Sequence, residues 1–206
     1  MGLRDRADDR QSESRAAAAA SRIGAGEAVE RPSEELRREA CALVPHVHVD
    51  ACVVVHDRLY VSGRLHERTT DWYTQDKEGN VWYYGEQTAT FAKNGHVEST
   101  EGTWRAGKDG AVPGIYMPAH PKAGYAARQE FLKGHAEDHF RVLDLHTTVK
   151  VPWGTSDQAL LTKEWTPLEP GVVDHKYYVR GVGTVLEQTV SGGTERNELV
   201  SFKPAS

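Results

Sequence analysis

The chain has 206 residues, a hydrophobic fraction of 38% and a formal net charge of −5 at pH 7. These values indicate one domain or two small ones, and they exclude the basic surface typical of nucleic-acid-binding proteins. No stretch approaches the roughly 20 apolar residues that a membrane span requires. The sequence therefore predicts no nucleic-acid partner and no membrane span, and it leaves the oligomeric state open.

The first part of the chain differs from the rest, because it is rich in Ala, Arg, Asp and Ser. We expect residues 1–45 to be poorly ordered, with a short helix over residues 33–43, and residues 46–206 to form one folded domain. The segment lacks the apolar core of a signal peptide, which predicts a cytoplasmic protein. One disulfide bridge between Cys41 and Cys52 could join the predicted helix to the first strand.

From residue 46 onward the hydrophobic pattern takes a period of two, which is typical of strands. The clearest hairpin runs from Asp71 to Glu86, where two aromatic stretches flank the turn Asp76-Lys77-Glu78-Gly79-Asn80. Gly79 is expected in the left-handed conformation, because only glycine adopts it without steric cost. Asn94-Gly95 predicts a second hairpin.

Two later segments contain glycines that indicate where strands end. Residues 125–143 fit either a helix or strands, and Gly134 in the middle favours strands near 126–132 and 136–143. Gly192-Gly193 predicts a two-residue turn that places Glu187 opposite Glu198. Together the patterns predict a mainly β fold, an antiparallel curved sheet or half-barrel with a short N-terminal helix and a disordered N-terminal tail.

The predicted pairing of Glu187 with Glu198 makes these two residues candidate catalytic carboxylates. If both faced a dry concavity, one would have a raised pKa and could act as an acid. Arg196 would lie diagonally from Glu187 and could instead neutralise a solvated pair. Neither a nucleophile elbow nor a phosphate-binding glycine loop is present in the sequence.

Histidine pairs provide the candidate metal ligands. His135, Glu137 and His139 share one face of a strand, and the two histidines also share a face of a helix, so either structure could hold zinc. A solvated polar face is the simpler explanation. His46-Val47-His48-Val49-Asp50 allows the same two readings, and the alternation of Asp76, Glu78 and Asn80 fits turn chemistry better than a calcium loop. The sequence favours no metal and no cofactor.

Aromatic residues alternate along the predicted strands, so about half of them must point into the core. The remainder could line a ligand-binding concavity. The candidate ligand-binding residues are Trp72, Trp82, Tyr84, Trp104, Trp165 and Tyr178.

Three segments resemble a widespread family of uncharacterised bacterial β-rich proteins. They are the aromatic hairpin of residues 71–86, the segment Trp165-Thr-Pro-Leu-Glu-Pro-Gly171, and residues Lys176 to Glu187. Val151 to Thr155 is also loosely similar to the open half-barrels of lipoprotein-carrier-like folds. The resemblance covers about residues 50–202 and implies an exported or envelope-associated protein, against the cytoplasmic expectation. It implies no reaction, cofactor or catalytic residue, and the charged residues 1–45 depart from the family pattern.

These observations predict a binding protein, without enzymatic activity, that takes a hydrophobic small molecule or lipid in an aromatic-lined concavity. Two alternatives remain open. One is a small hydrolase or metal-dependent enzyme that uses Glu187 and Glu198 or the histidine pairs, and the other is a structural module that interacts through a sheet edge.

Overall fold

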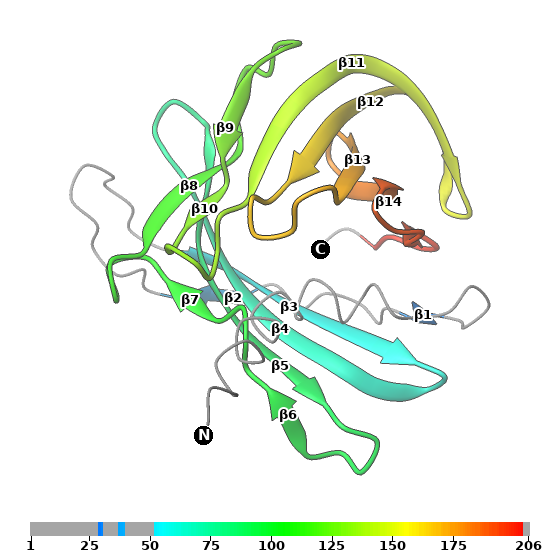
Figure 1. Cartoon of the computed structure of the whole chain (residues 1–206). Coiled ribbons are helices and arrows are strands. Elements are labelled where there is room, and N and C mark those ends of the chain that lie inside the picture. Colours follow the sequence, from blue (N-terminus) through cyan, green and yellow to red (C-terminus); the bar gives the residue numbers. More distant parts are fainter. Residues whose placement is uncertain (1–28, 31–36, 40–51, 204–206) are drawn as a thin grey trace, which may run out of the picture.

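The computed structural model describes residues 29–30, 37–39 and 52–203, which form antiparallel sheets and no helix (Figure 1). The first sheet has nine strands: β1 Val29–Glu30, β2 Arg37–Glu39, β3 Cys52–Val61, β4 Arg64–Gln75, β5 Val81–Phe91, β6 Val97–Ser99, β7 Trp104–Arg105, β8 Val112–Met117 and β10 Glu130–Phe131. They run in the order β1-β3-β4-β5-β8-β10, with β2 beside β3, and β6 and β7 beside β5.

The second sheet has six strands: β9 Ala126–Arg128, β11 His139–Val151, β12 Gly154–Trp165, β13 Val173–Val179, β14 Gly183–Ser191 and β15 Arg196–Glu198. Their order is β15-β14-β13-β12-β11-β9, so most neighbours in the sheet are also neighbours in the chain. Neither sheet closes into a barrel. The described part of the chain holds no helix that is long and apolar enough to cross a membrane.

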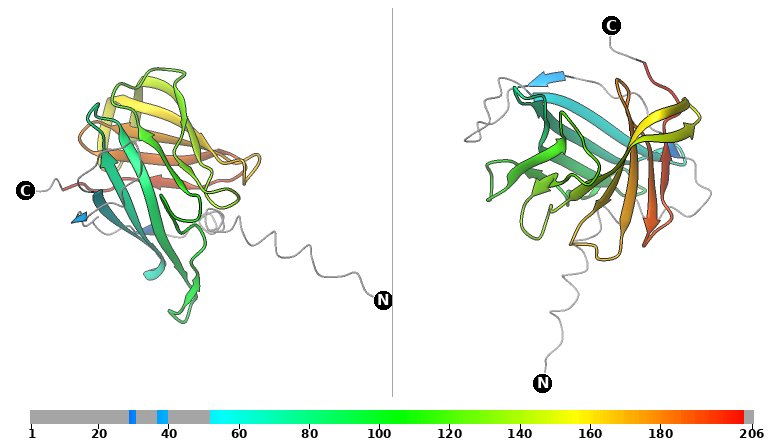
Figure 2. Two further views of the ribbon diagram at one scale, coloured as in Figure 1. Left: turned by 90° about the vertical axis from the view of Figure 1, so that its left-hand side faces the viewer. Right: turned by 90° about the horizontal axis from the view of Figure 1, so that it is seen from above.

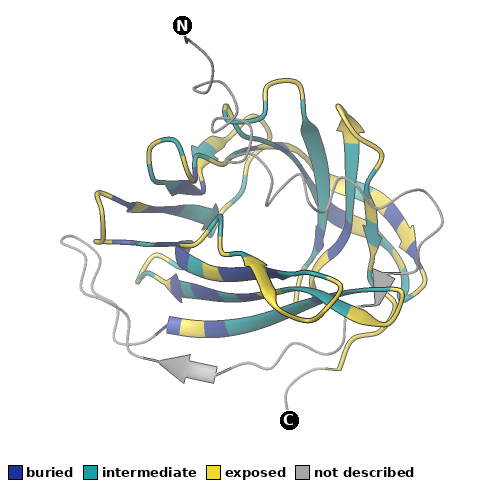
Figure 3. Cartoon of the chain, turned by 60° about the horizontal axis from the view of Figure 1, so that its bottom comes forward, coloured by how far each residue is buried: buried dark blue, intermediate teal, exposed yellow. Residues whose placement is uncertain are grey.

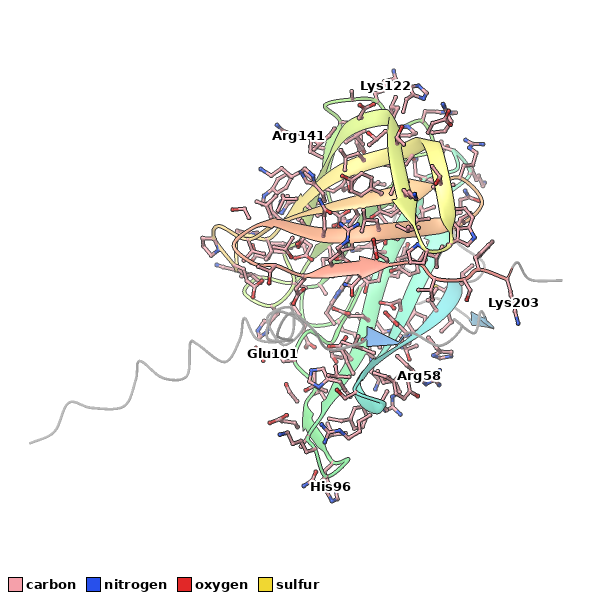
Figure 4. All side chains as sticks on the ribbon, turned by 90° about the vertical axis from the view of Figure 1, so that its right-hand side faces the viewer. Arg58, His96, Glu101, Lys122, Arg141 and Lys203 are labelled. Atoms are coloured by element: carbon pink, nitrogen blue, oxygen red, sulfur yellow. The ribbon has the colours of Figure 1, made fainter. Side chains whose placement is uncertain are left out.

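The two sheets come together at β8, β9 and β10 and diverge from there (Figures 1 and 2). Strands β11 and β12 bend strongly as they leave this region, whereas β3, β4 and β5 extend to the opposite side (Figure 1). Buried and exposed residues alternate along many strands (Figure 3), as expected for sheets with one covered face. Charged side chains such as Arg58, Lys122 and Arg141 lie on the outside of the molecule (Figure 4).

The structure confirms the predicted hairpins. In the β4–β5 hairpin Gln75 pairs with Val81, and Gly79 has φ +90°. The turn at Asn94-Gly95 joins β5 to β6, with Gly95 at φ +83°. Residues 126–128, 130–131 and 139–151 are strands, so the preference for strands over a helix around Gly134 was correct.

Two expectations were wrong. Arg37–Glu39 pairs with β3 as a strand, so the predicted helix over residues 33–43 does not exist there, and its other residues lie outside the described part. The β14–β15 register is shifted by one residue, because Glu187 faces Asn197 and Glu198 faces Leu186. A wider loop causes the shift: the Thr189 amide donates to the Glu195 carbonyl at 2.9 Å, instead of a tight turn at the two glycines.

The core consists of two separate clusters. The first cluster lies in the first sheet around Val54, Trp72, Tyr84 and Trp104, and the second lies in the second sheet around Val149, Ala159, Val185 and Leu186. Cys52 belongs to the first cluster, is 1% exposed and is disulfide-bonded. The other cysteine of the sequence, Cys41, lies outside the described residues, and the predicted boundary at residue 45 stays a prediction.

Gly114 marks the place where the two sheets meet. It lies in β8 against the backbone of Arg128 and Gln129, which connect β9 to β10. A Cβ atom at position 114 would overlap the carbonyl groups of both residues. Because backbone atoms cannot yield as the end of a flexible side chain can, this position requires glycine.

We predict that Gly114→Ala lowers the free energy of unfolding by about 3 kcal/mol, since overpacking against backbone forces the two sheets apart. The matched control is Gly154→Ala in β12, where a Cβ atom meets nothing within 4 Å. Urea denaturation should show a loss for the first variant and a change within about 0.5 kcal/mol for the second. Equal stability of the two variants would contradict the packing described for β8.

Candidate functional site

A row of five aromatic rings connects the first sheet to the second. Tyr83 stands edge-on to Trp104 at a centroid distance of 5.4 Å and stacks on Tyr73 at 4.8 Å. Tyr73 contacts Tyr116 at 4.9 Å, and Tyr116 contacts Tyr178 of β13 edge-on at 6.3 Å. We call these five residues the aromatic row. It joins β4, β5, β7 and β8 of one sheet to β13 of the other.

The register of the β4–β5 hairpin brings the row together. Tyr73 pairs directly with Tyr83, so both rings point to the same face. A bulge follows, after which Asp71 pairs with Glu86. Since Asp71 lies two residues from Tyr73 in the same strand, its side chain and that of Glu86 share the face of the two tyrosines.

A lysine and two glutamates lie at the β13 end of the aromatic row. The Nζ atom of Lys176 is 3.1 Å from Glu164 Oε2 and 3.3 Å from Glu187 Oε1. Glu164 is 6% exposed and also accepts hydrogen bonds from the hydroxyls of Tyr178 and Thr162, both at 2.8 Å. Burial opposes the charge of Lys176, but the carboxylates of Glu164 and Glu187 outweigh it and raise the lysine pKa well above its usual range.

Four carboxyl groups, which we call the acidic group, lie at the other end: Asp71, Glu86, Glu130 and Asp138. Burial raises the pKa of Glu86 and Glu130 well above the usual range. Their negatively charged neighbours raise both further, chiefly Glu130 for Glu86 and Asp138 for Glu130. The pKa of Asp138 is raised by burial and lowered by Lys176. Burial and mutual repulsion therefore favour the uncharged, protonated forms of Glu86 and Glu130.

Hydrogen bonding differs between the polar groups around the acidic group. Asp71 accepts a hydrogen bond of 2.5 Å from the Tyr83 hydroxyl. Glu130 Oε2 and the indole NH of Trp104, in contrast, are buried without a partner. The Trp104 indole lowers the Glu130 pKa as a side-chain hydrogen-bond donor, so the two groups approach each other without reaching close hydrogen-bonding geometry. Unpaired buried polar atoms are uncommon in folded proteins, and they often mark a functional position.

The predicted ligand-binding residues divide between several places. Trp104 and Tyr178 belong to the aromatic row. Trp72 and Tyr84 are buried in the first core cluster, where the Arg105 guanidinium lies 3.7 Å from the Trp72 ring centroid. The other two predicted residues, Trp82 and Trp165, are not among the five rings of the row.

Trp82 and Trp165 have identifiable structural contacts. The indole NH of Trp82 donates to Asp76 Oδ2 at 2.8 Å, which ties the ring to the hairpin turn. Trp165 stacks on His139 with a centroid distance of 5.6 Å. It follows Glu164 in β12, so its ring points to the opposite face of the sheet from the Lys176 ion pair.

The structure separates the predicted catalytic carboxylates. Glu187 points toward Lys176, whereas Glu198 lies on the other face beside Leu186. Arg196 contacts Glu198 at 2.6 Å and Gln188 at 2.5 Å, and it does not neutralise Glu187 as the sequence suggested. Glu187 and Glu198 therefore form no carboxylate dyad.

The candidate metal ligands are engaged elsewhere or exposed. His135 is exposed, the Glu137 carboxylate accepts the Gly134 amide at 2.7 Å, and His139 Nδ1 lies 2.7 Å from the Glu137 carbonyl oxygen. Within residues 52–203 no three His, Cys, Asp or Glu side chains are placed to hold a metal ion. His46, His48 and Asp50 lie outside the described residues.

The Asp76 turn is a hydrogen-bonded network within the protein. The carboxylate of Asp76 accepts the Asn80 amide, the Asn80 side-chain NH₂ and the Trp82 indole NH, each at 2.8 Å. Asn80 Oδ1 accepts the Ala119 amide at 2.9 Å, which fastens the turn to the loop after β8. Desolvation opposes the effect, but the donors from Trp82 and Asn80 lower the Asp76 pKa. These contacts explain the spacing that resembled a calcium loop.

A second group of carboxyls lies beside the Lys176 ion pair. Burial, together with repulsion from Asp174, Glu187 and Glu169, raises the pKa of Glu195 to about 7. The Oε1 atom of Glu195 is buried without a hydrogen-bond partner among the described residues. The Asp174 carboxylate accepts the Thr189 hydroxyl at 2.7 Å. Glu195 thus changes charge near neutral pH.

Sequence reasoning missed Lys176, Glu164 and the acidic group. One signal was available: Thr162, Glu164, Lys176 and Tyr178 occupy alternate positions of two strands that are expected to pair. This alternation places polar and ionisable side chains on one face. Which sheet face is covered depends on the approach of the second sheet, and local pattern does not reveal it.

Comparison with known proteins does not change this picture, since no family model, curated protein or solved structure matches the chain.

We predict that Asp76→Ala lowers the free energy of unfolding by about 2 kcal/mol, because three donors lose a charged acceptor. Glu78→Ala is the matched control in the same turn, since Glu78 is exposed. Urea denaturation followed by tryptophan fluorescence measures both. If the two variants lose the same small amount, the turn network does not stabilise the hairpin.

The raised pKa of Glu195 predicts that stability decreases as pH rises. The folded state holds the proton up to about pH 7, whereas the unfolded chain releases it near 4.5, so its contribution is complete below 4.5 and is lost through pH 7. Glu195→Gln should flatten the fall of the melting temperature between pH 5 and pH 8. An unchanged pH profile in this variant would show that Glu195 titrates normally.

Proposed function

We propose that this protein binds an amphipathic small molecule, without chemically changing it, on the inner face of a β half-barrel formed by the two sheets. The aromatic row carries the proposal. The five rings contact in sequence across two sheets, and the half-buried rings of Tyr73 and Tyr116 keep surface that a ligand could cover. Trp104, Tyr83 and Tyr178 are buried and support them. The carboxyl and ammonium groups at both ends offer hydrogen bonds and charge.

The burial pattern supports a concave inner face. Part of the surface of Tyr73, Tyr116 and Lys176 is accessible to solvent, and Asp138 is exposed. Protein atoms nevertheless surround these groups closely enough for desolvation to influence their pKa values. This combination of solvent contact and desolvation supports the proposed concave shape of the inner face.

The chemistry of the face refines the kind of ligand. A purely hydrophobic ligand would leave Lys176 and the acidic group facing apolar atoms, at a substantial desolvation cost. An amphipathic molecule places its apolar part on the aromatic row and its polar part at one end. The disulfide at Cys52 favours the exported or envelope setting implied by the family resemblance over a cytoplasmic one.

A hydrolase remains the second candidate, now on different residues. The raised pKa of Glu130 would suit a general acid, with Glu86 as the neighbouring carboxylate. A binding protein releases the intact ligand, whereas a hydrolase releases the products of its cleavage. Mass spectrometry of a recovered ligand distinguishes them, since a binding protein returns the ligand chemically unchanged.

We predict saturable binding of Nile red, a neutral dye whose fluorescence increases in apolar surroundings. Tyr116→Leu removes the central ring of the aromatic row and should weaken binding about two- to tenfold, since ring stacking is worth about 0.5–1.5 kcal/mol beyond the area it buries. Trp165→Leu is the matched control, because it removes a ring on the opposite face of β12.

Dye fluorescence titration measures both variants, and circular dichroism confirms that they are folded. Equal weakening by the two substitutions, or no saturable binding by the unaltered protein, would contradict the proposed site.

A further inference from the structure

We infer that the outer face of the second sheet binds to the surface of a membrane that contains anionic lipids. The area concerned lies where β9, β11 and β12 pair, and it carries the cations Arg128, Arg141 and Lys163. We call these three residues the basic face. Lys163 precedes Glu164 in β12, so the basic face lies on the side of the sheet opposite to the Lys176 ion pair and does not depend on the proposed ligand site.

The strand register brings the three cations together. Arg141 of β11 pairs directly with Lys163 of β12, and Lys163 pairs with His175 of β13. Arg128 of β9 pairs with His139, which lies two residues before Arg141 in β11. Because directly paired residues share a face and neighbouring strands are only about 4.8 Å apart, these side chains form one array across four strands.

Burial shows that the array faces outward. The residues of β11 and β12 that alternate with it are at most 6% exposed: Phe140, Val142, Thr162 and Glu164. Arg128 and Arg141, in contrast, are exposed, and Lys163 is half-buried. Figure 4 shows Arg141 on the outside of the molecule. A partner can therefore reach the basic face without entering a cavity.

The three cations are not neutralised by the protein. Within residues 52–203, no carboxylate forms an ion pair with Arg128, Arg141 or Lys163. Aromatic rings contact two of them instead. The Arg128 guanidinium lies 4.0 Å from the ring centroid of Phe131, and the Lys163 ammonium lies 5.4 Å from that of Trp165. The rings hold these side chains in place and leave their positive charge available to a partner.

The positive charge is local, because the whole chain has a formal net charge of −5. One carboxylate shares the face. Asp144 is exposed, pairs with Leu161 beyond a bulge of β11, and accepts the His146 amide at 2.9 Å. Since Leu161 lies two residues before Lys163, Asp144 stands at the margin of the basic face. It opposes the attraction of anions with a single charge.

The layout suits a lipid surface better than a small anion or a single polyanion chain. The three cations spread in two dimensions over neighbouring strands, as the separate head groups of a membrane do. Leu143 follows Arg141 by two residues and is 38% exposed on the same face. Anionic membranes attract Lys and Arg side chains, and they also take an exposed leucine out of water, which a soluble polyanion does not do.

The test is co-sedimentation of the full chain with lipid vesicles at neutral pH and low salt. One set contains only phosphatidylcholine, and the other contains equal parts of phosphatidylcholine and the anionic phosphatidylglycerol. We expect attachment to the anionic vesicles to be at least about tenfold tighter, because each Lys or Arg near an anionic surface strengthens attachment about fivefold. Salt at about 0.5 M should remove the difference, since it screens exposed charges.

Three variants locate the attachment. Arg141→Gln combined with Lys163→Gln should weaken attachment to the anionic vesicles at least about tenfold. Lys93→Gln combined with Lys108→Gln is the matched control, because it removes the same charge from exposed loops of the first sheet and should change attachment less than about threefold. Asp144→Asn removes the opposing carboxylate and should strengthen attachment about fivefold. Circular dichroism confirms that each variant is folded.

Each result decides for or against the inference. Equal attachment to neutral and anionic vesicles overturns it, and so does an equal loss in the two double variants. If the first double variant does not fold, the absence of a gain in Asp144→Asn overturns it. Retention on a heparin column without attachment to vesicles assigns the basic face to a soluble polyanion and also overturns it. The proposed function is tested separately by Nile red, whose binding these variants should leave unchanged.

Discussion

The inner face depends on the ion pair of Lys176 with Glu164 and Glu187. Partly buried charges are stable only when their partners are close and their remaining hydrogen-bonding capacity is used. Glu164 meets this condition, because its carboxylate accepts hydrogen bonds from the hydroxyls of Tyr178 and Thr162 and forms an ion pair with Lys176. Since Tyr178 also contacts Tyr116 of the first sheet, the same network fixes how the aromatic row passes between the sheets. Removal of Lys176 alone would leave two carboxylates uncompensated beside the already repelling acidic group.

The two ends of the inner face have different electrostatic states. At the β13 end, Lys176 is paired with Glu164 and Glu187, and Glu164 accepts the Tyr178 hydroxyl, although Glu195 beside them keeps an unpaired oxygen. At the Trp104 end, carboxyls repel one another, and Glu130 and Trp104 retain unpaired polar atoms. Natural proteins usually break the rules of polar satisfaction at functional positions.

The sequence predicted local structure well where a single residue determines the backbone. Gly79 and Gly95 set two hairpins, and the period-two pattern identified the strands on both sides of each. It failed where more distant contacts decide. The two glycines at 192–193 suggested a tight turn, but a wider loop moved the register by one residue and separated Glu187 from Glu198. Of the five residues in the aromatic row, the sequence identified only Trp104 and Tyr178 as candidate ligand-binding residues. The row forms because Tyr116 of β8 meets Tyr178 of β13, and no local pattern predicts that contact.

The central claim is that the aromatic row is the ligand-binding surface, and nuclear magnetic resonance of tyrosine-labelled protein tests it most directly. The ring signals of Tyr83, Tyr116 and Tyr178 should shift together as Nile red is added, with one shared affinity. Tyr177 should not shift, because it precedes Tyr178 in β13 and its ring lies on the opposite face, against the core of the second sheet. Shifts at Tyr177 without shifts in the row, or no saturable shift in any ring, would contradict the account.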